Sequence, residues 1–111
     1  MGKEFKILAI DGGGIKGLYS ACILKHLEER HGDCHLADYF DLICGTSTGG
    51  LIALALSLRK RAGEIADFYA KKGEEIFPYV NRRARAYAFI RQTFWFGKYS
   101  DVALRKSLEA F

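Results

Sequence analysis

Residues 40–49 read FDLICGTSTG, and this stretch decides the fold because it joins a short apolar run to a serine set between glycines. The apolar run predicts a β-strand over about residues 41–44, and the apolar residues 51–56, LIALAL, predict a helix directly afterwards. The serine therefore lies on a sharp strand-to-helix turn, where the positive end of the helix dipole favours a developing negative charge. This placement predicts that Ser47 is a nucleophile.

A second glycine-rich turn lies upstream, where residues 5–17 read FKILAIDGGGIKG. They predict a strand over about residues 5–10, followed by a helix over about 18–31. If the two strands are parallel and joined by that helix, both turns lie at the same edge of the sheet. Consecutive glycines leave backbone N–H groups unobstructed by side chains. We therefore expect the amides of Gly12, Gly13 and Gly14 to form an oxyanion hole beside Ser47.

The remaining helices are predicted from their apolar periodicity. The helix over residues 48–58 is apolar on all sides, which predicts burial all round. Further helices are expected over about 62–76 and after Ser100, where Ser100 is a candidate N-cap. The faces predicted to point inward carry Tyr19, Ile23 and Leu27 in the first helix, Ile65, Phe68, Tyr69 and Ile76 in the third, and Val102, Leu104 and Leu108 in the last. Lys25, Glu28 and Glu29 are expected to face water.

The chain has 111 residues, of which 50% are hydrophobic and 27% charged, as in a globular protein. Two strands are too few for a typical sheet of about five or six. We therefore expect residues 1–111 to be the first part of a larger α/β domain that continues beyond Phe111. No signal-peptide pattern and no apolar run long enough to span a membrane is present. Three cysteines without metal-like spacing indicate reduced thiols, a cytoplasmic location and no metal site.

Residues 77–99 combine eight aromatic side chains with five cations and no carboxylate, and the five cations account for the whole net charge of +4. Cations favour anionic headgroups, and Trp and Tyr favour the membrane interface. The tract is therefore a candidate peripheral contact with an anionic membrane surface, with a helical cap over residues 79–96. The alternative is a cationic surface helix whose aromatic rings pack into the core. The modest net charge gives no reason to expect nucleic-acid binding.

The two turns together resemble the start of the patatin-like phospholipase domain. The likeness is specific over residues 5 to about 58 and looser to the end of the chain. It implies a three-layer α/β/α sandwich with a mainly parallel central sheet, of which this chain supplies the first strands and helices. It also implies cleavage of lipid acyl esters by a Ser-Asp dyad, without histidine, metal or cofactor. By position, Lys16 occupies the basic place in the first motif. The motif residues are Gly12, Gly14 and Gly17 (GXGXXG), and Gly45, Thr46, Ser47, Thr48 and Gly49 (GXSXG).

The second catalytic residue that the resemblance implies is absent from these residues. In the family it is an aspartate in an Asp-Gly-Gly or Asp-Gly-Ala turn downstream of the serine, whereas the one Asp-Gly-Gly here begins at Asp11 and belongs to the oxyanion loop. Asp67 and Asp101 fall in predicted helices and precede no glycine. The catalytic aspartate is therefore expected outside this chain. The histidines, His26, His31 and His35, all precede Ser47, unlike the Ser-Asp-His order of α/β-hydrolases.

Two other classes of function remain open at this point. The spacing of Gly12, Gly14 and Gly17 after a strand also fits a dinucleotide-binding loop, although no acidic residue ends a second strand at the required distance. Sugar-kinase and actin-like proteins place a similar loop against phosphate, but a β-hairpin would follow it. A copy without a general base could also bind lipid or a protein partner without turnover, because serine alone is a poor nucleophile.

Overall fold

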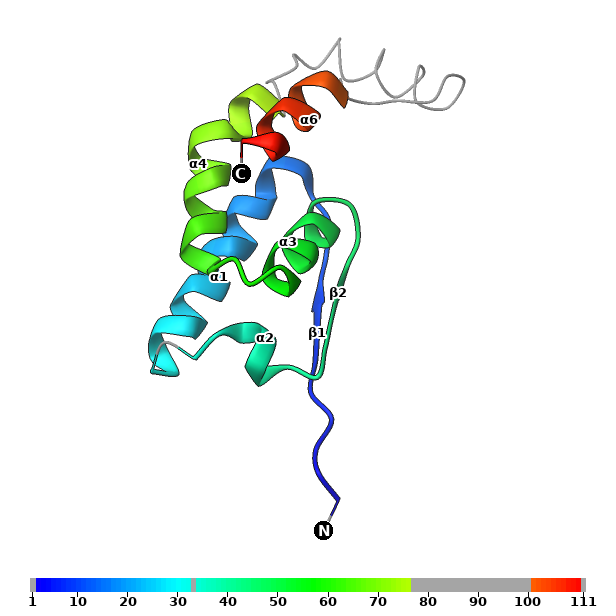
Figure 1. Cartoon of the computed structure of the whole chain (residues 1–111), viewed down its shortest axis with the longest axis vertical. Helices are drawn as coiled ribbons and strands as arrows, with labels where there is room; N and C mark the ends of the chain where they lie inside the picture. Colours follow the sequence, from blue (N-terminus) through cyan, green and yellow to red (C-terminus); the bar gives the residue numbers. More distant parts are fainter. Residues whose placement is uncertain (1, 33, 77–100, 111) are drawn as a thin grey trace. The chain divides into compact units, whose positions relative to one another are not determined.

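A computed structural model describes residues 2–32, 34–76 and 101–110 (Figure 1). The chain divides into two compact units, residues 1–71 and 72–111. The first unit contains both strands and most of the helices, and the second contains the end of α4 together with α6. In chain order the elements are β1 (Ile7–Ile10), the 3-10 helix η1 (Gly14–Lys16), α1 (Gly17–Arg30), α2 (Leu36–Tyr39), β2 (Leu42–Gly45), α3 (Thr48–Ser57), α4 (Ala62–Ile76) and α6 (Asp101–Glu109).

The sheet confirms the parallel arrangement predicted from the sequence. β1 and β2 pair in parallel, from Ile7 opposite Leu42 to Ile10 opposite Gly45, and the intervening chain holds α1 and α2. α3 packs against both strands, and α1 packs against α3. These helices cover one face, whereas Ile7 and Leu42 on the other face are 56% and 46% exposed. Helices and a parallel sheet are the elements of the predicted α/β fold, and the described helices leave one sheet face uncovered.

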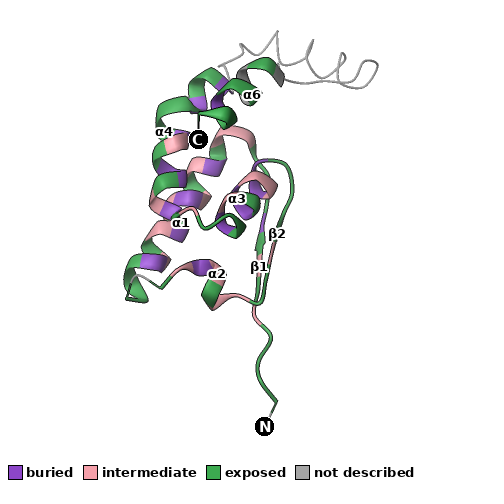
Figure 2. Cartoon of the chain, viewed as in Figure 1, coloured by how far each residue is buried: buried purple, intermediate pink, exposed green. Residues whose placement is uncertain are grey.

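Several of the burial predictions are wrong. Glu28, predicted to face water, is buried beside Gly17, Ala21 and Leu24. Tyr19 and Ile23, predicted to point inward, are 72% and 49% exposed. Figure 2 shows buried and exposed stretches along α1. Gly17 lies where α1 meets α3, since a Cβ there would overlap the Thr48 side chain. α3 is not buried all round either, since its Leu54 is 59% exposed and the following Leu58 is 70% exposed. Neighbouring elements cover only part of the circumference of α3.

The helix over residues 62–76 has the predicted bounds, with Ile65, Tyr69 and Ile76 buried and Phe68 half-buried. A helix also follows Ser100 as predicted, since α6 begins at Asp101, although Ser100 itself is not among the described residues. Exposure of Val102 and Leu108 does not fit their predicted inward face. The predictions for residues 77–99, including the cap over 79–96, lie outside the described residues.

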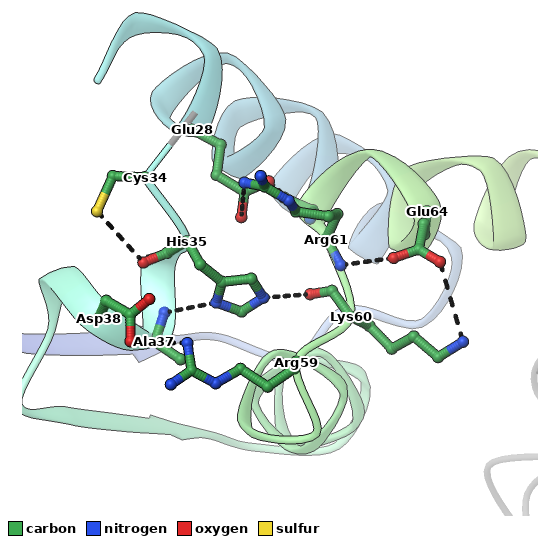
Figure 3. Close-up of polar contacts among 10 residues, drawn as sticks. Glu28, Cys34, His35, Ala37, Asp38, Arg59, Lys60, Arg61 and Glu64 are labelled. Carbon is green, nitrogen blue, oxygen red and sulfur yellow. Dashed lines mark hydrogen bonds and ion pairs between the residues drawn. The ribbon is translucent and has the colours of Figure 1, made fainter. Parts of the chain in front are cut away.

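The loop between α3 and α4 is held by a polar network that the sequence did not reveal (Figure 3). Glu28 is 4% exposed, and its carboxylate accepts a hydrogen bond from the Ala62 N–H at 3.0 Å and lies 3.7 Å from the Arg61 guanidinium. The Arg61 N–H donates to Glu64 at 2.8 Å, which is one half of a capping box. Two carboxylates therefore satisfy N–H groups at the start of α4, where the helix dipole also favours negative charge.

His35 belongs to the same network and has a structural role there. The His35 ring accepts a hydrogen bond at Nδ1 from the Ala37 N–H (3.1 Å), so the proton is on Nε2, which lies 3.1 Å from the Lys60 carbonyl and donates to it. His35 therefore caps α2 and ties it to the loop before α4. His26 pairs with Glu29 on the surface of α1 at 3.4 Å, and His31 is exposed.

Replacing Glu28 with alanine in the full-length protein is expected to lower the free energy of unfolding by about 1–3 kcal/mol, because the buried Ala62 N–H would lose its acceptor. The matched control is Glu29→Ala, which removes an exposed carboxylate from the next position of the same helix. Chemical denaturation of the two variants measures the difference. Equal stabilities would show that Glu28 has no structural role.

Candidate active site

The two glycine-rich turns meet at one edge of the sheet, as predicted. β1 ends at Ile10 and β2 ends at Gly45, and these two residues are partners in the parallel ladder. Just beyond them, the Thr46 N–H donates to the Ile10 carbonyl at 3.2 Å, and the Gly12 N–H donates to the Thr46 hydroxyl at 3.1 Å. The turn that contains Ser47 is therefore joined directly to the glycine loop after β1.

Ser47 occupies a strained backbone conformation, with φ 52° and ψ −122°. A non-glycine residue in such a region costs about 1–3 kcal/mol and persists only where the surrounding structure holds it. The Ser47 carbonyl accepts hydrogen bonds from the Gly50 and Leu51 N–H groups, at 2.9 and 3.2 Å, so α3 begins immediately after it. Serine at this N-cap position usually bonds its own helix, but the Ser47 side chain makes no capping bond. Ser47 is exposed, and within the described residues its hydroxyl makes no hydrogen bond.

Close approach explains the glycines around the serine. A Cβ at Gly49 would overlap the Ile10 carbonyl, and a Cβ at Gly45 would overlap the backbone of Gly49. The first turn of α3 therefore passes directly over the ends of both strands. A Cβ at Gly17 would likewise overlap the Thr48 side chain, so the last glycine of the first motif is needed where α1 meets α3.

The glycine loop presents backbone N–H groups beside the serine turn. A Cβ at Gly12 would lie 2.9 Å from the Ser47 Cβ, which shows how near the two turns are. The Gly12 amide already donates to Thr46, whereas those of Gly13 and Gly14 donate to no group within the described part of the chain. Gly14 has φ 61°, a left-handed conformation that favours glycine. Lys16 is exposed and closes the turn through its N–H to the Gly13 carbonyl at 3.2 Å.

One neighbour of the site was not predicted from the sequence. Tyr69 of α4 is 3% exposed, and its hydroxyl lies 3.5 Å from the carbonyl of Thr48, the residue after Ser47. Burial raises the pKa of Tyr69 to about 12, so its hydroxyl stays protonated at neutral pH and acts as the donor. The sequence placed Tyr69 on the inner face of its helix. Because a buried tyrosine hydroxyl needs a hydrogen-bond partner, its predicted burial could have indicated a polar contact of this kind.

The structure does not bring a general base to Ser47. Within the described residues, no carboxylate or imidazole forms a hydrogen bond with the Ser47 hydroxyl. Asp67 is exposed on α4 and Asp101 is the first residue of α6, so both fall in helices as predicted. His35 serves the network at the loop between α3 and α4.

Two features of the described residues concern membrane spans and metal sites. No helix there is both long enough and apolar enough to cross a membrane. No group of three or more histidine, cysteine, aspartate or glutamate side chains in that part of the chain is arranged to hold a metal ion.

Comparisons of the sequence with known proteins agree on one protein family. The model of the patatin-like phospholipase family matches residues 8–111. The chain is 42% identical to patatin-like protein 1 of Oryza sativa subsp. indica over 96% of its own length, and 42% identical to patatin-17 of Solanum cardiophyllum over 69%. It is 39% identical to the cGAMP-activated phospholipase of Escherichia coli (strain TW11681) over 66%. No solved structure gives a significant match.

The matches cover most of this chain but less than a third of each relative. The chain spans 29%, 23% and 22% of the length of these three proteins, respectively. The family model nevertheless covers nearly all 111 residues, including both glycine-rich turns. The strand–turn–helix geometry around Ser47 agrees with that match. The chain belongs to the patatin-like phospholipase family.

Proposed function

We propose that the protein is a serine lipid acyl hydrolase that cleaves fatty-acyl esters of phospholipids, and that residues 1–111 are the N-terminal part of its catalytic domain. The observation that carries the proposal is the junction of the two turns: an exposed, strained Ser47 lies against a glycine loop at the C-terminal edge of a parallel sheet. Membership of the patatin-like phospholipase family supports the substrate class. Phospholipase activity is also named for the Escherichia coli relative.

In the proposed reaction, the Ser47 hydroxyl oxygen attacks the ester carbonyl carbon while its proton passes to a general base. The proposed base is an aspartate outside residues 1–111, which completes a Ser-Asp dyad. The carbonyl oxygen becomes an oxyanion and accepts hydrogen bonds from the glycine loop. Collapse of this intermediate expels the lysophospholipid alkoxide, which takes the proton from the aspartic acid, and leaves an acyl-enzyme. Water, deprotonated by the aspartate, then attacks the acyl group, and release of the fatty acid returns the proton to Ser47.

We assign the oxyanion hole to the backbone of Gly12, Gly13 and Gly14. Gly13 and Gly14 are the principal donors in this proposal, because the Gly12 N–H donates to the Thr46 hydroxyl. Removal of a single oxyanion donor typically costs about 10²–10³ in kcat. The start of α3 adds a favourable helix dipole at the same place.

The geometry does not favour a phosphate-binding loop of the actin-like or sugar-kinase type. α1 follows the glycine loop where actin-like and sugar-kinase loops would lead into a β-hairpin. Lys16 is followed by Gly17, so the Ser or Thr of a Walker A loop is missing.

Incubation of the full-length protein with phospholipid vesicles tests the proposal. Fatty acid should be released from diacyl phospholipid, and none from the matched dialkyl ether phospholipid, because the ether lacks a carbonyl for Ser47 to attack. Binding to both lipids without any release would instead identify a non-catalytic lipid-binding protein. Stabilisation by ATP or NAD without lipid hydrolysis would favour the nucleotide-binding class.

A further inference from the structure

The turn that contains Ser47 is contacted by Tyr69 of α4, an element that follows β1, β2 and α3 in the chain. Thr48, the first residue of α3, is 1% exposed. Its side chain packs where a Cβ at Gly17 would lie, and its carbonyl faces the hydroxyl of Tyr69 at 3.5 Å. The position of that Gly17 Cβ is also 3.6 Å from the Tyr69 ring. α1, α3 and α4 therefore meet at the residue next to the nucleophile.

The direction of the contact is fixed by its chemistry. A carbonyl oxygen can only accept, so the Tyr69 hydroxyl donates, and its raised pKa of about 12 keeps the proton in place at any pH at which the enzyme would work. At 3.5 Å the bond is long for O–H···O, so it is a weak restraint that acts on a buried group. The backbone of Ser47 is strained and needs the surrounding structure to hold it.

We propose that Tyr69 is a positioning residue for Ser47, which fixes the strained turn by hydrogen bonding to the Thr48 carbonyl. The proposal rests on the hydrolase function proposed above, in which Ser47 is the nucleophile. Packing of the ring alone would not require the hydroxyl, since phenylalanine fills the same space. The hydroxyl reaches the one backbone carbonyl that lies immediately after Ser47 in the chain.

The test uses Tyr69→Phe in the full-length protein, because this change removes the hydroxyl and keeps the ring. Tyr19→Phe is the matched control, since it removes the same group from a side chain that is 72% exposed on α1. Ester hydrolysis below the unfolding temperature of each variant should show kcat lowered about 2- to 3-fold by Tyr69→Phe, the effect of one weak hydrogen bond, with KM unchanged. Tyr19→Phe should leave both parameters unchanged.

A second readout does not depend on hydrolysis. Amide hydrogen exchange should become faster about 2- to 3-fold in residues 46–52 of the Tyr69→Phe protein, while Tyr19→Phe has no effect there. Unchanged exchange in this segment would overturn the inference, and so would faster exchange with an unchanged kcat. If the wild-type protein releases no fatty acid at all, the hydrolase proposal fails together with the catalytic role of Tyr69. Faster exchange would then show only that the contact restrains the turn.

Discussion

Ser47→Ala is expected to abolish fatty-acid release by the full-length protein, with a loss in kcat of about 10⁴–10⁶-fold. Losses of this size follow removal of the nucleophile in serine hydrolases, because the oxyanion hole and substrate binding alone give only weak catalysis. The fold should persist, since the Ser47 side chain makes no capping bond to α3. Fatty-acid release per mole of folded protein measures the loss, and thermal unfolding measures the fold.

Ser57→Ala is the matched control for this experiment. Ser57 lies at the other end of α3, where its hydroxyl donates to the Ala53 carbonyl at 2.9 Å. Its replacement should leave hydrolysis unchanged. A folded Ser47→Ala protein that still releases fatty acid at the wild-type rate would exclude Ser47 as the nucleophile.

Gly49→Ala should have the largest effect on stability. The added methyl group would overlap the Ile10 carbonyl, which is backbone and cannot move aside as a flexible side chain can. α3 would have to shift away from the end of β1, and overpacking of this kind costs up to about 3 kcal/mol. Because the shift begins two residues from Ser47, hydrolysis should fall as well. Chemical denaturation of the full-length protein gives the free-energy change.

Gly63→Ala provides the control, because it makes the same substitution near the start of α4. The nearest atoms to its new Cβ are those of the Lys25 side chain at 3.8 Å, an ordinary contact distance. Alanine also favours a helix over glycine by about 0.5–1 kcal/mol. Gly63→Ala should therefore be neutral or stabilising. A Gly49→Ala protein as stable as wild type would show that α3 does not cross β1 this closely.

The turns and the strand order could be predicted from the sequence more reliably than which side chains are buried. Gly45 and Gly49 around Ser47 encode their turn locally, because a helix can pass so near a strand only without Cβ atoms. The parallel pairing follows because a strand, a helix and a second strand in the same sheet form a right-handed crossover between parallel strands. Both features can be read from the glycine spacing and the order of the elements, whatever side chains surround them.

The burial predictions that failed depend on distant contacts. Glu28 looked like one residue of a polar face, yet the Ala62 N–H lies opposite its carboxylate. Leu54 looked buried because its whole helix is apolar, but exposure depends on which neighbours are present. The contact between Tyr69 and Thr48 joins positions 21 apart, and helical periodicity gave only the inward direction of Tyr69.

The most direct measurement of the central claim is mass spectrometry of the full-length protein after treatment with a serine-directed fluorophosphonate. The reagent phosphonylates only a serine that is activated as a nucleophile, and it needs no knowledge of the natural lipid. We expect a single adduct on Ser47, formed in parallel with the loss of fatty-acid release. An unmodified Ser47 in protein that hydrolyses lipid, or an adduct on a different serine, would contradict the account.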